Sequence, residues 1–106
     1  METIEYLPLG SIVRIKSVER EIMIVARGIQ FEQEGKQLFY DYGAVLYPEG
    51  LTGDELVYFN REAVAETVFS GYHDDEDTIV CDLISRFVQT HPGLNRPQPV
   101  RPDLWS

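Results

Sequence analysis

The spacing of apolar residues changes once along this 106-residue chain, at Gly71, and that change limits the folds the chain can adopt. Before Gly71, apolar side chains alternate with polar ones or form short runs, as in "IVRIK" and "EIMIVARG", a pattern typical of β-strands. After Gly71, residues 79–88 place apolar side chains at spacings of one and four, which is typical of one face of a helix. The chain is therefore predicted to be a β part followed by a helix.

The β part divides into a hairpin and several further strands. Residues 11–27 are expected to form the hairpin with "SVERE" as its turn, because turn residues precede it and its second strand is a nearly continuous apolar run. A loop or a second turn is expected over residues 30–37, and a long strand that Gly43 interrupts overlaps its end. A glycine inside a strand marks a bulge or bend, as a small barrel requires. Shorter strands, with one helical turn between them, are expected over residues 56–59 and 66–71.

The helix is expected over residues 74–90. Four carboxylates occupy its first turns, where the helix dipole favours negative charge, and Pro92-Gly93 stops it. The predicted buried face consists of Ile79, Val80, Leu83, Ile84, Phe87 and Val88, and the opposite face of Asp82, Ser85, Arg86 and Gln89. The proline-rich tail beyond it contains "RPQPVRP", which is either a spacer or a form that SH3 domains bind.

Together these elements predict one α+β domain over residues 1–91 and a tail over residues 92–106. About five antiparallel strands are expected to form a small, partly open SH3-like β-barrel. The C-terminal α-helix is expected to cover one mouth of the barrel or one face of the sheet. Antiparallel pairing is favoured because the connections before the helix are too short for parallel crossovers.

The charge and the cysteine content limit the partners and the cellular compartment that can be expected. The net charge is -9, and residues 37–106 carry twelve acidic against four basic residues. Such a field repels nucleic acid and anionic lipid, so neither is an expected partner, and a basic or apolar protein partner is favoured. The sequence has no apolar run of membrane-spanning length and no signal-peptide pattern, and its single cysteine, Cys81, fits a reducing compartment. A cytoplasmic protein is therefore expected.

The residues that most often carry chemistry are poorly arranged for it. The cluster "HDDED" at residues 73–77 does not suit a metal ion, because consecutive helical residues diverge by about 100°. His73 and His91 flank the expected helix and lie too far apart to act together. Cys81 lies in an acidic region, which favours a buried, inert thiol over a nucleophile. No catalytic residue, metal site or cofactor is predicted, and the protein is not expected to be an enzyme.

The stretch "YDYGAVLYPEGLTGDELVYFN", residues 40–60, contains four of the six tyrosines and a wide acidic turn, but no His, Lys or Cys. It is expected to form a bent strand, a loop and a return strand. Most of its tyrosines are expected in the core, whereas those that face outward beside the loop form a candidate recognition surface. The predicted partner-binding residues are Tyr42, Tyr47, Glu49, Leu51, Asp54, Glu55, Tyr58 and, in the tail, Trp105.

Four segments follow one another along the β part of the chain: "YLPLGSIVRIK", "IMIVARG", "YDYGAVLYPEGLTGDELVYFN" and "VFSGYHDDE". Over residues 6–77 this order resembles a family of small, uncharacterised proteins of Gram-positive bacteria that are encoded beside LXG toxins of type VII secretion. The Tyr-Pro-Glu-Gly and Gly-Asp-Glu pieces before "VYFN" are the most specific parts of the resemblance.

The resemblance implies a non-enzymatic accessory protein, namely a cytosolic adaptor or chaperone that binds a cognate LXG toxin before export. The same setting admits an alternative, an immunity protein that neutralises a cognate toxin through its acidic surface. The partner is accordingly a cognate toxin or another protein of the secretion locus. The resemblance supplies no catalytic residues, and it leaves open whether the chain forms a homodimer and whether the tail is ordered.

Overall fold

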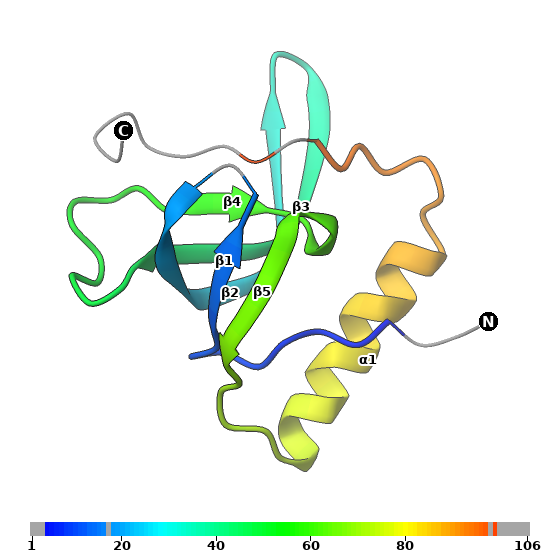
Figure 1. Cartoon of the computed structure of the whole chain (residues 1–106). Coiled ribbons are helices and arrows are strands. Elements are labelled where there is room, and N and C mark those ends of the chain that lie inside the picture. The colour runs from blue at the N-terminus through cyan, green and yellow to red at the C-terminus, as the bar shows by residue number, and fades with distance from the viewer. Residues whose placement is uncertain (1–3, 17, 98, 100–106) are drawn as a thin grey trace.

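The computed structural model describes residues 4–16, 18–97 and 99. Its elements are β1 (Ile12–Ile15), β2 (Val18–Gln33), β3 (Lys36–Leu46), β4 (Val57–Phe59), the 3₁₀ turn η1 (Arg61–Ala63), β5 (Val64–Phe69) and α1 (Asp75–Gln89). The strands form one antiparallel sheet in the order β4-β3-β2-β1-β5 (Figure 1). The predicted α+β class, with five antiparallel strands and a C-terminal helix, is confirmed.

The sheet is open and is not closed into a barrel. β4 and β5 lie at its two edges and do not pair with each other in the described part of the chain. β4 spans only three residues, and the register of β5 against β1 shifts twice. Short and bulged edge strands oppose further pairing. The expected SH3-like barrel is therefore not confirmed.

β2 and β3 form a long hairpin whose tip extends beyond the rest of the sheet (Figure 1). Of the loop or second turn expected over residues 30–37, the structure shows a turn of two residues only, because strand pairing continues as far as Gln33 and Lys36. Glu34 and Gly35 alone form the turn, and their φ angles are 52° and 78°. Positive φ at both positions matches the two-residue turns whose twist suits a hairpin. The residues at this tip are mostly polar, so the sequence did not indicate that the two strands pair as far as the turn.

A bulge bends the same hairpin near its middle. Ile24 pairs with Ala44 and Ala26 pairs with Gly43, so Val25 is the extra residue. The irregularity expected at Gly43 is therefore present, but the extra residue belongs to the opposite strand. Bulges increase the local twist of a strand pair, and this one lies where the hairpin leaves the main sheet.

The main core lies on the face of the sheet that α1 and the N-terminal segment cover. Twelve buried residues form it: Tyr6, Val13, Ile15, Val18, Ile22, Ile24, Tyr42, Ala44, Leu46, Val57, Phe59 and Cys81. β3 is buried on both faces from Phe39 to Leu46. On the face away from this core, the Tyr40 ring packs against Phe31 and Tyr58, with ring centroids 5.7 Å away in each case. A fully buried strand explains why so many aromatic residues gather in β3.

Residues 4–8 run between the sheet and α1 (Figure 1). The Ile4 N–H donates to Ser85 Oγ on the helix at 2.9 Å, and the Leu7 N–H donates to the Tyr42 hydroxyl on β3 at 2.9 Å. Two backbone N–H groups of this segment thus donate hydrogen bonds to side chains, one on the helix and one on the sheet. The N-terminal segment therefore joins the helix to the sheet.

The helix α1 matches the predicted range, and the Asp74 side chain caps it by accepting from the Asp77 N–H at 3.0 Å. Its predicted buried face is partly wrong. Cys81 and Ser85 are the buried residues, whereas Ile79, Val80 and Leu83 are exposed. Polar contacts, from Ser85 to Ile4 and from Asp77 to Arg27, orient the helix and turn the aliphatic side chains outward. Among the described residues, no helix is both long and apolar enough to cross a membrane.

Candidate functional site

A row of apolar side chains crosses the face of the sheet opposite the main core. Phe69 pairs with Ile12, Ile12 with Met23, and Met23 with Val45. Residues directly opposite each other in antiparallel strands point to the same face. Phe69 is 59% exposed, Ile12 and Met23 are half-buried, and Val45 is buried. The row is therefore covered at β3 and open to solvent at β5.

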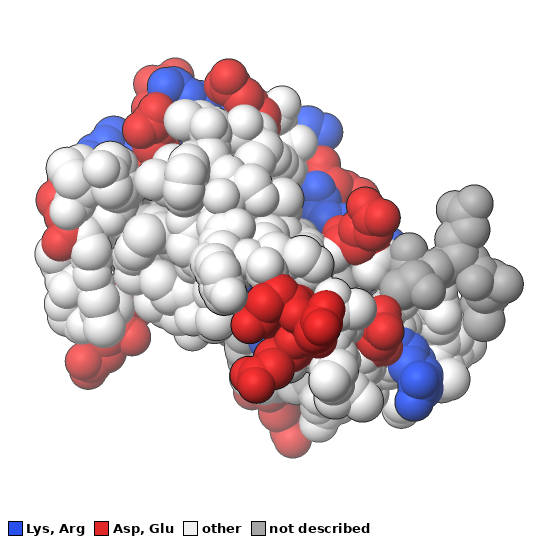
Figure 2. Space-filling view, turned by 90° about the horizontal axis from the view of Figure 1, so that it is seen from below, with Lys and Arg blue, Asp and Glu red and all other residues white. Residues whose placement is uncertain are grey.

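Further apolar side chains extend this row. The Gly10 N–H donates to the Ile24 oxygen at 2.8 Å, which brings Leu9 and Val25, both exposed, close to the row. We define the outer apolar surface as Leu9, Ile12, Met23, Val25 and Phe69. Seen from below, the molecule presents a broad face without charged side chains, with both acidic and basic groups at its margin and a dense acidic group at one side (Figure 2).

Tyr72 lies beside the outer apolar surface. The Gly71 N–H donates to Ser11 Oγ at 2.9 Å, which fixes the chain after β5 against the start of β1. Tyr72 follows directly and is among the most exposed aromatic residues in the described chain. A tyrosine of this kind offers a large apolar ring and a hydroxyl at the same position.

A row of paired charges borders the outer apolar surface. Arg14 Nη2 lies 3.0 Å from Glu21 Oε2, and Arg14 Nε lies 3.4 Å from Glu66 Oε1. Arg14 and Glu66 also pair as neighbours on β1 and β5. All three side chains are accessible to water, so these pairs contribute little to stability. They leave one guanidinium between two carboxylates, and the border therefore carries a net negative charge.

The loop after β3 begins next to this border. The Tyr47 N–H donates to the Glu21 oxygen at 3.0 Å. Arg20 Nη2 donates to both oxygens of Glu49, at 2.7 and 2.8 Å, and these hydrogen bonds lower the pKa of Glu49. Tyr47 and Leu51 are exposed, with 44% and 60% of their surface accessible, and Asp54 and Glu55 are exposed as well. Five of the predicted partner-binding residues thus lie at the surface of one loop.

The other three predicted residues do not join them. Tyr42 is 1% exposed, so its predicted place on a partner-binding surface is wrong. Its hydroxyl accepts from the Leu7 N–H, and burial raises its pKa to about 12. Tyr58 is half-buried against Phe31 and Tyr40. Trp105 lies outside the described residues. Alternation alone could not reveal that β3 is covered on both faces.

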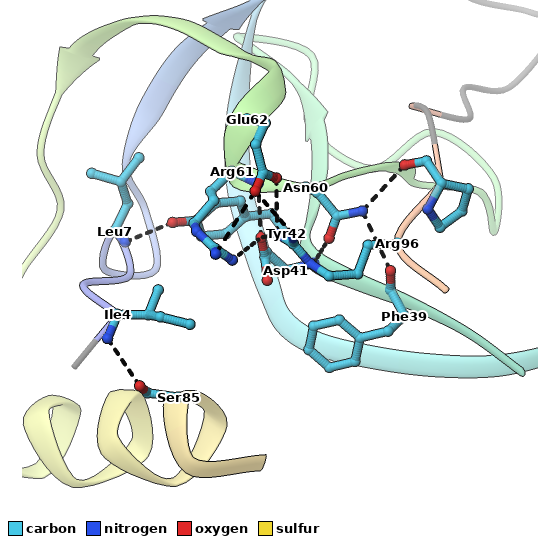
Figure 3. Close-up of polar contacts among 11 residues, drawn as sticks. Ile4, Leu7, Phe39, Asp41, Tyr42, Asn60, Arg61, Glu62, Ser85 and Arg96 are labelled. Carbon is cyan, nitrogen blue, oxygen red and sulfur yellow. Dashed lines mark hydrogen bonds and ion pairs between the residues drawn. The ribbon is translucent and has the colours of Figure 1, made fainter. Parts of the chain in front are cut away.

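A buried carboxylate, which sequence reasoning missed, lies on the same strand. Asp41 is fully buried, and its Oδ2 accepts from the Arg61 N–H at 2.8 Å, from Arg61 Nη1 at 3.2 Å and from Arg96 Nη2 at 2.6 Å. Glu62 accepts from the same Arg96 guanidinium at 2.8 and 2.9 Å (Figure 3). The sequence did contain one indication of this cluster, namely a single Asp between two tyrosines in an apolar strand. A charge buried in such a strand requires a partner of opposite charge.

The second oxygen of Asp41 faces the core. Asp41 Oδ1 and the Tyr6 hydroxyl have no hydrogen-bond partner of good geometry among the described residues. Burial raises the pKa of Tyr6, and the negative charge of Asp41 raises it further. The Tyr6 phenol therefore stays neutral.

Cys81 lies in a second polar cluster, at the start of α1. It is buried as expected, and Arg27 Nη1 lies 3.3 Å from its Sγ. Burial raises the pKa of the thiol, with Arg27 and Asp77 acting in opposite directions. His73 Nδ1 lies 2.7 Å from Asp77 Oδ2. Within the described chain, no group of three or more His, Cys, Asp or Glu side chains is placed to hold a metal ion.

Comparison with known proteins gives one match. The family model for the domain of unknown function DUF4176 matches residues 6–80, which include all five strands and the start of α1. Neither the search of curated proteins nor the search of solved structures found a match. Because the matched segment covers more than half of the sequence, the chain belongs to the DUF4176 family.

Proposed function

We propose that this chain is a non-enzymatic adaptor or chaperone that binds a cognate LXG toxin in the cytosol before type VII secretion. The identity of the partner follows from the resemblance of residues 6–77 to proteins encoded beside such toxins. The feature of the molecule that supports a binding role is the outer apolar surface, together with the exposed loop that begins at Tyr47.

The outer apolar surface has the composition of the centre of a protein interface. It contains Phe69 and Met23, and exposed Tyr72 lies beside it. Aromatic residues and Met are enriched in interfaces. Burial of one large apolar side chain stabilises a complex by about 2 kcal/mol before the costs of association. The paired charges at the border would remain accessible to solvent in the complex, as residues at the rim of an interface do.

The charge of the chain favours a partner segment that is apolar and basic. The net charge is -9, and a dense acidic group lies at one side of the uncharged face (Figure 2). Opposite charges around an apolar centre speed association and suppress wrong partners. An amphipathic, basic segment of the toxin is therefore the proposed occupant.

Co-expression with the LXG toxin encoded in the same locus tests this proposal. The two chains are expected to elute together in size-exclusion chromatography. Phe69→Ser is expected to weaken the complex at least about tenfold, which corresponds to the loss of one well-buried aromatic contact. Leu83→Ser, at an equally exposed position on α1, serves as the matched control and is expected to leave the complex intact. Separate elution of the wild-type chain and the toxin would count against the proposal.

Immunity is the second candidate function, and the exposed acidic residues at the start of α1, Asp75 and Glu76, favour it. Such a cluster could cover the basic active site of a toxin. Rescue of cells that express the toxic domain alone would select immunity. A requirement for the N-terminal part of the toxin, with loss of export and no loss of viability, would select the adaptor.

A further inference from the structure

The C-terminal segment takes a place at the edge of the sheet that β4 leaves free. β4 pairs with residues 42–44 of β3. Further along the same edge, Asn95 forms a parallel bridge with Leu38, and the Phe39 N–H donates to the Asn95 oxygen at 2.9 Å. An extended segment added to a sheet edge in this way is a common mode of peptide recognition.

The side chain of Arg96 is the anchor of this segment. Its guanidinium lies 2.6 Å from Asp41 Oδ2 and 2.8 Å from Glu62 Oε1, and only 20% of the side chain is exposed. Two carboxylates from different elements thus converge on one guanidinium (Figure 3). Charge-assisted, two-pronged contacts of this kind select arginine over lysine.

Asn60 contacts the backbone on both sides of the anchor. Its Oδ1 accepts from the Asp41 N–H at 2.9 Å, and its Nδ2 donates to the Phe39 oxygen at 3.4 Å. The same Nδ2 donates to the Pro97 oxygen at 3.2 Å. The buried amide of Asn60 therefore fixes the position of the C-terminal segment along β3. It contacts only the backbone of that segment, so this contact does not depend on the side chains of the segment.

Among the described side chains, the two carboxylates, Asp41 and Glu62, have only one cationic partner other than Arg96, namely Arg61. Arg61 pairs with Asp41, whereas the shortest contact of Glu62 to a guanidinium is to Arg96. Without Arg96, two carboxylates would share Arg61 alone. Lys16 donates to the backbone oxygen of Glu62 at 3.1 Å. A cavity of about 390 Å³, partly lined by Lys16, Glu62 and Pro97, continues beyond the anchor.

We propose that the edge of β3 at residues 38–41, together with Asn60 and Glu62, is a recognition site for an extended, arginine-bearing segment of a partner protein. The chain's own residues 95–97 occupy it in the absence of that partner. The site is separate from the outer apolar surface and does not depend on the proposed adaptor role. A partner segment must compete with a tethered occupant, so the wild-type chain binds such segments weakly.

A peptide-binding measurement tests the proposal. The probe is a fluorescein-labelled peptide with the sequence of residues 93–99, "GLNRPQP", and the receptor is the full chain carrying Arg96→Ala. Fluorescence anisotropy is expected to show saturable binding to this variant and at least about tenfold weaker binding to the wild-type chain. Replacing the peptide arginine by lysine is expected to weaken binding about tenfold, and alanine to abolish it, since charge-assisted bonds are lost.

Variants of this recognition site give the controls. Glu62→Gln on the Arg96→Ala background is expected to weaken peptide binding about tenfold, whereas Glu66→Gln, at a similarly exposed carboxylate on β5, is expected to leave it unchanged. Near-ultraviolet circular dichroism checks that each variant is folded. Folded Arg96→Ala chain that fails to bind, or that binds arginine and alanine peptides equally, overturns the proposal. So does a wild-type dimer that Arg96→Ala converts to monomer, because the occupant would then be a second copy.

Discussion

Arg27 on β2 and Asp77 on α1 form an ion pair in which Nη2 and Oδ1 lie 2.6 Å apart, with side chains only 6% and 11% exposed. Arg27 also donates to the Leu7 oxygen through Nη1, at 3.4 Å. One guanidinium therefore joins the sheet, the N-terminal segment and the helix. The pair sets which face of α1 is buried.

Loss of Arg27 should destabilise the protein strongly, because it leaves a largely buried carboxylate without its guanidinium partner. Arg27→Met is expected to lower the free energy of unfolding by about 3 kcal/mol, as measured by urea denaturation. Arg14→Met removes an exposed ion pair and is expected to cost less than about 1 kcal/mol. If the double variant Arg27→Met/Asp77→Leu is no more stable than Arg27→Met alone, the loss does not come from an unpaired charge.

The same pair predicts how stability depends on pH. Burial raises the pKa of Asp77, but hydrogen bonds from His73 and Arg27 outweigh it, so the net pKa is lowered. A carboxyl whose pKa is lower in the folded state contributes stability above its unfolded pKa, and loses it as pH falls through the folded pKa. Asp77 should therefore stabilise the fold at neutral pH, begin to lose this contribution near about pH 4, and lose it fully once the pH has fallen below its folded pKa.

Urea denaturation at pH 7 and pH 3 measures this contribution. The wild-type chain is expected to lose more stability between the two pH values than Asp77→Asn does, since the variant has no proton to bind at that position. Asp54→Asn, an exposed loop carboxylate, is the control and should show the same pH dependence as the wild type. Equal pH dependence in the wild type and Asp77→Asn would contradict the assignment.

The hairpin turn offers a stabilising change. Glu34 has a φ of 52° and precedes Gly35 in the β2–β3 turn. Asn tolerates this left-handed conformation better than Glu, and Asn-Gly is the favoured pair in such turns. Glu34→Asn is expected to raise the free energy of unfolding by about 0.5 kcal/mol, measured by urea denaturation. Glu32→Asn, in the adjoining strand, should give no gain. A gain of equal size in both variants would contradict the role of the turn.

Local rules were sufficient for much of the fold. A nearly continuous apolar run identified the strand around Ile22, and alternation identified the strand around Tyr40. The carboxylates at residues 74–77 located the start of the helix. The buried face of the helix was not predictable in this way. It depends on contacts of Asp77 and Ser85 with residues 50 or more positions away in the sequence, and a polar residue in a helix pattern indicates solvent unless its distant partner is known.

The candidate site was less predictable than the fold for the same reason. The loop residues Tyr47 and Leu51 are exposed as expected, because turn chemistry is local. Phe69 and Met23 come together only through the pairing of β5, β1 and β2, which no local pattern specifies. The contact of Arg96 with Asp41 spans 55 residues, and it shows that part of the expected tail packs against the domain.

Gly71 should be sensitive to any side chain, because it packs against backbone at the edge of the outer apolar surface. A β-carbon there would overlap the Leu9 oxygen and lie 2.9 Å from Ser11 N. These atoms belong to the turn before β1 and cannot move as a flexible side chain does. Gly71→Ala is expected to lower the free energy of unfolding by about 2 kcal/mol, measured by urea denaturation.

The matched control for this change is Gly93→Ala, since a β-carbon at Gly93 meets no atom within 4 Å. That variant is expected to keep the stability of the wild type. Displacement of Leu9 in Gly71→Ala should also disturb the outer apolar surface, so the variant is expected to bind the proposed toxin partner more weakly than Gly93→Ala does. A Gly71→Ala chain as stable as Gly93→Ala would show that the turn at Leu9 adjusts freely, and would contradict this close approach of the two backbone segments.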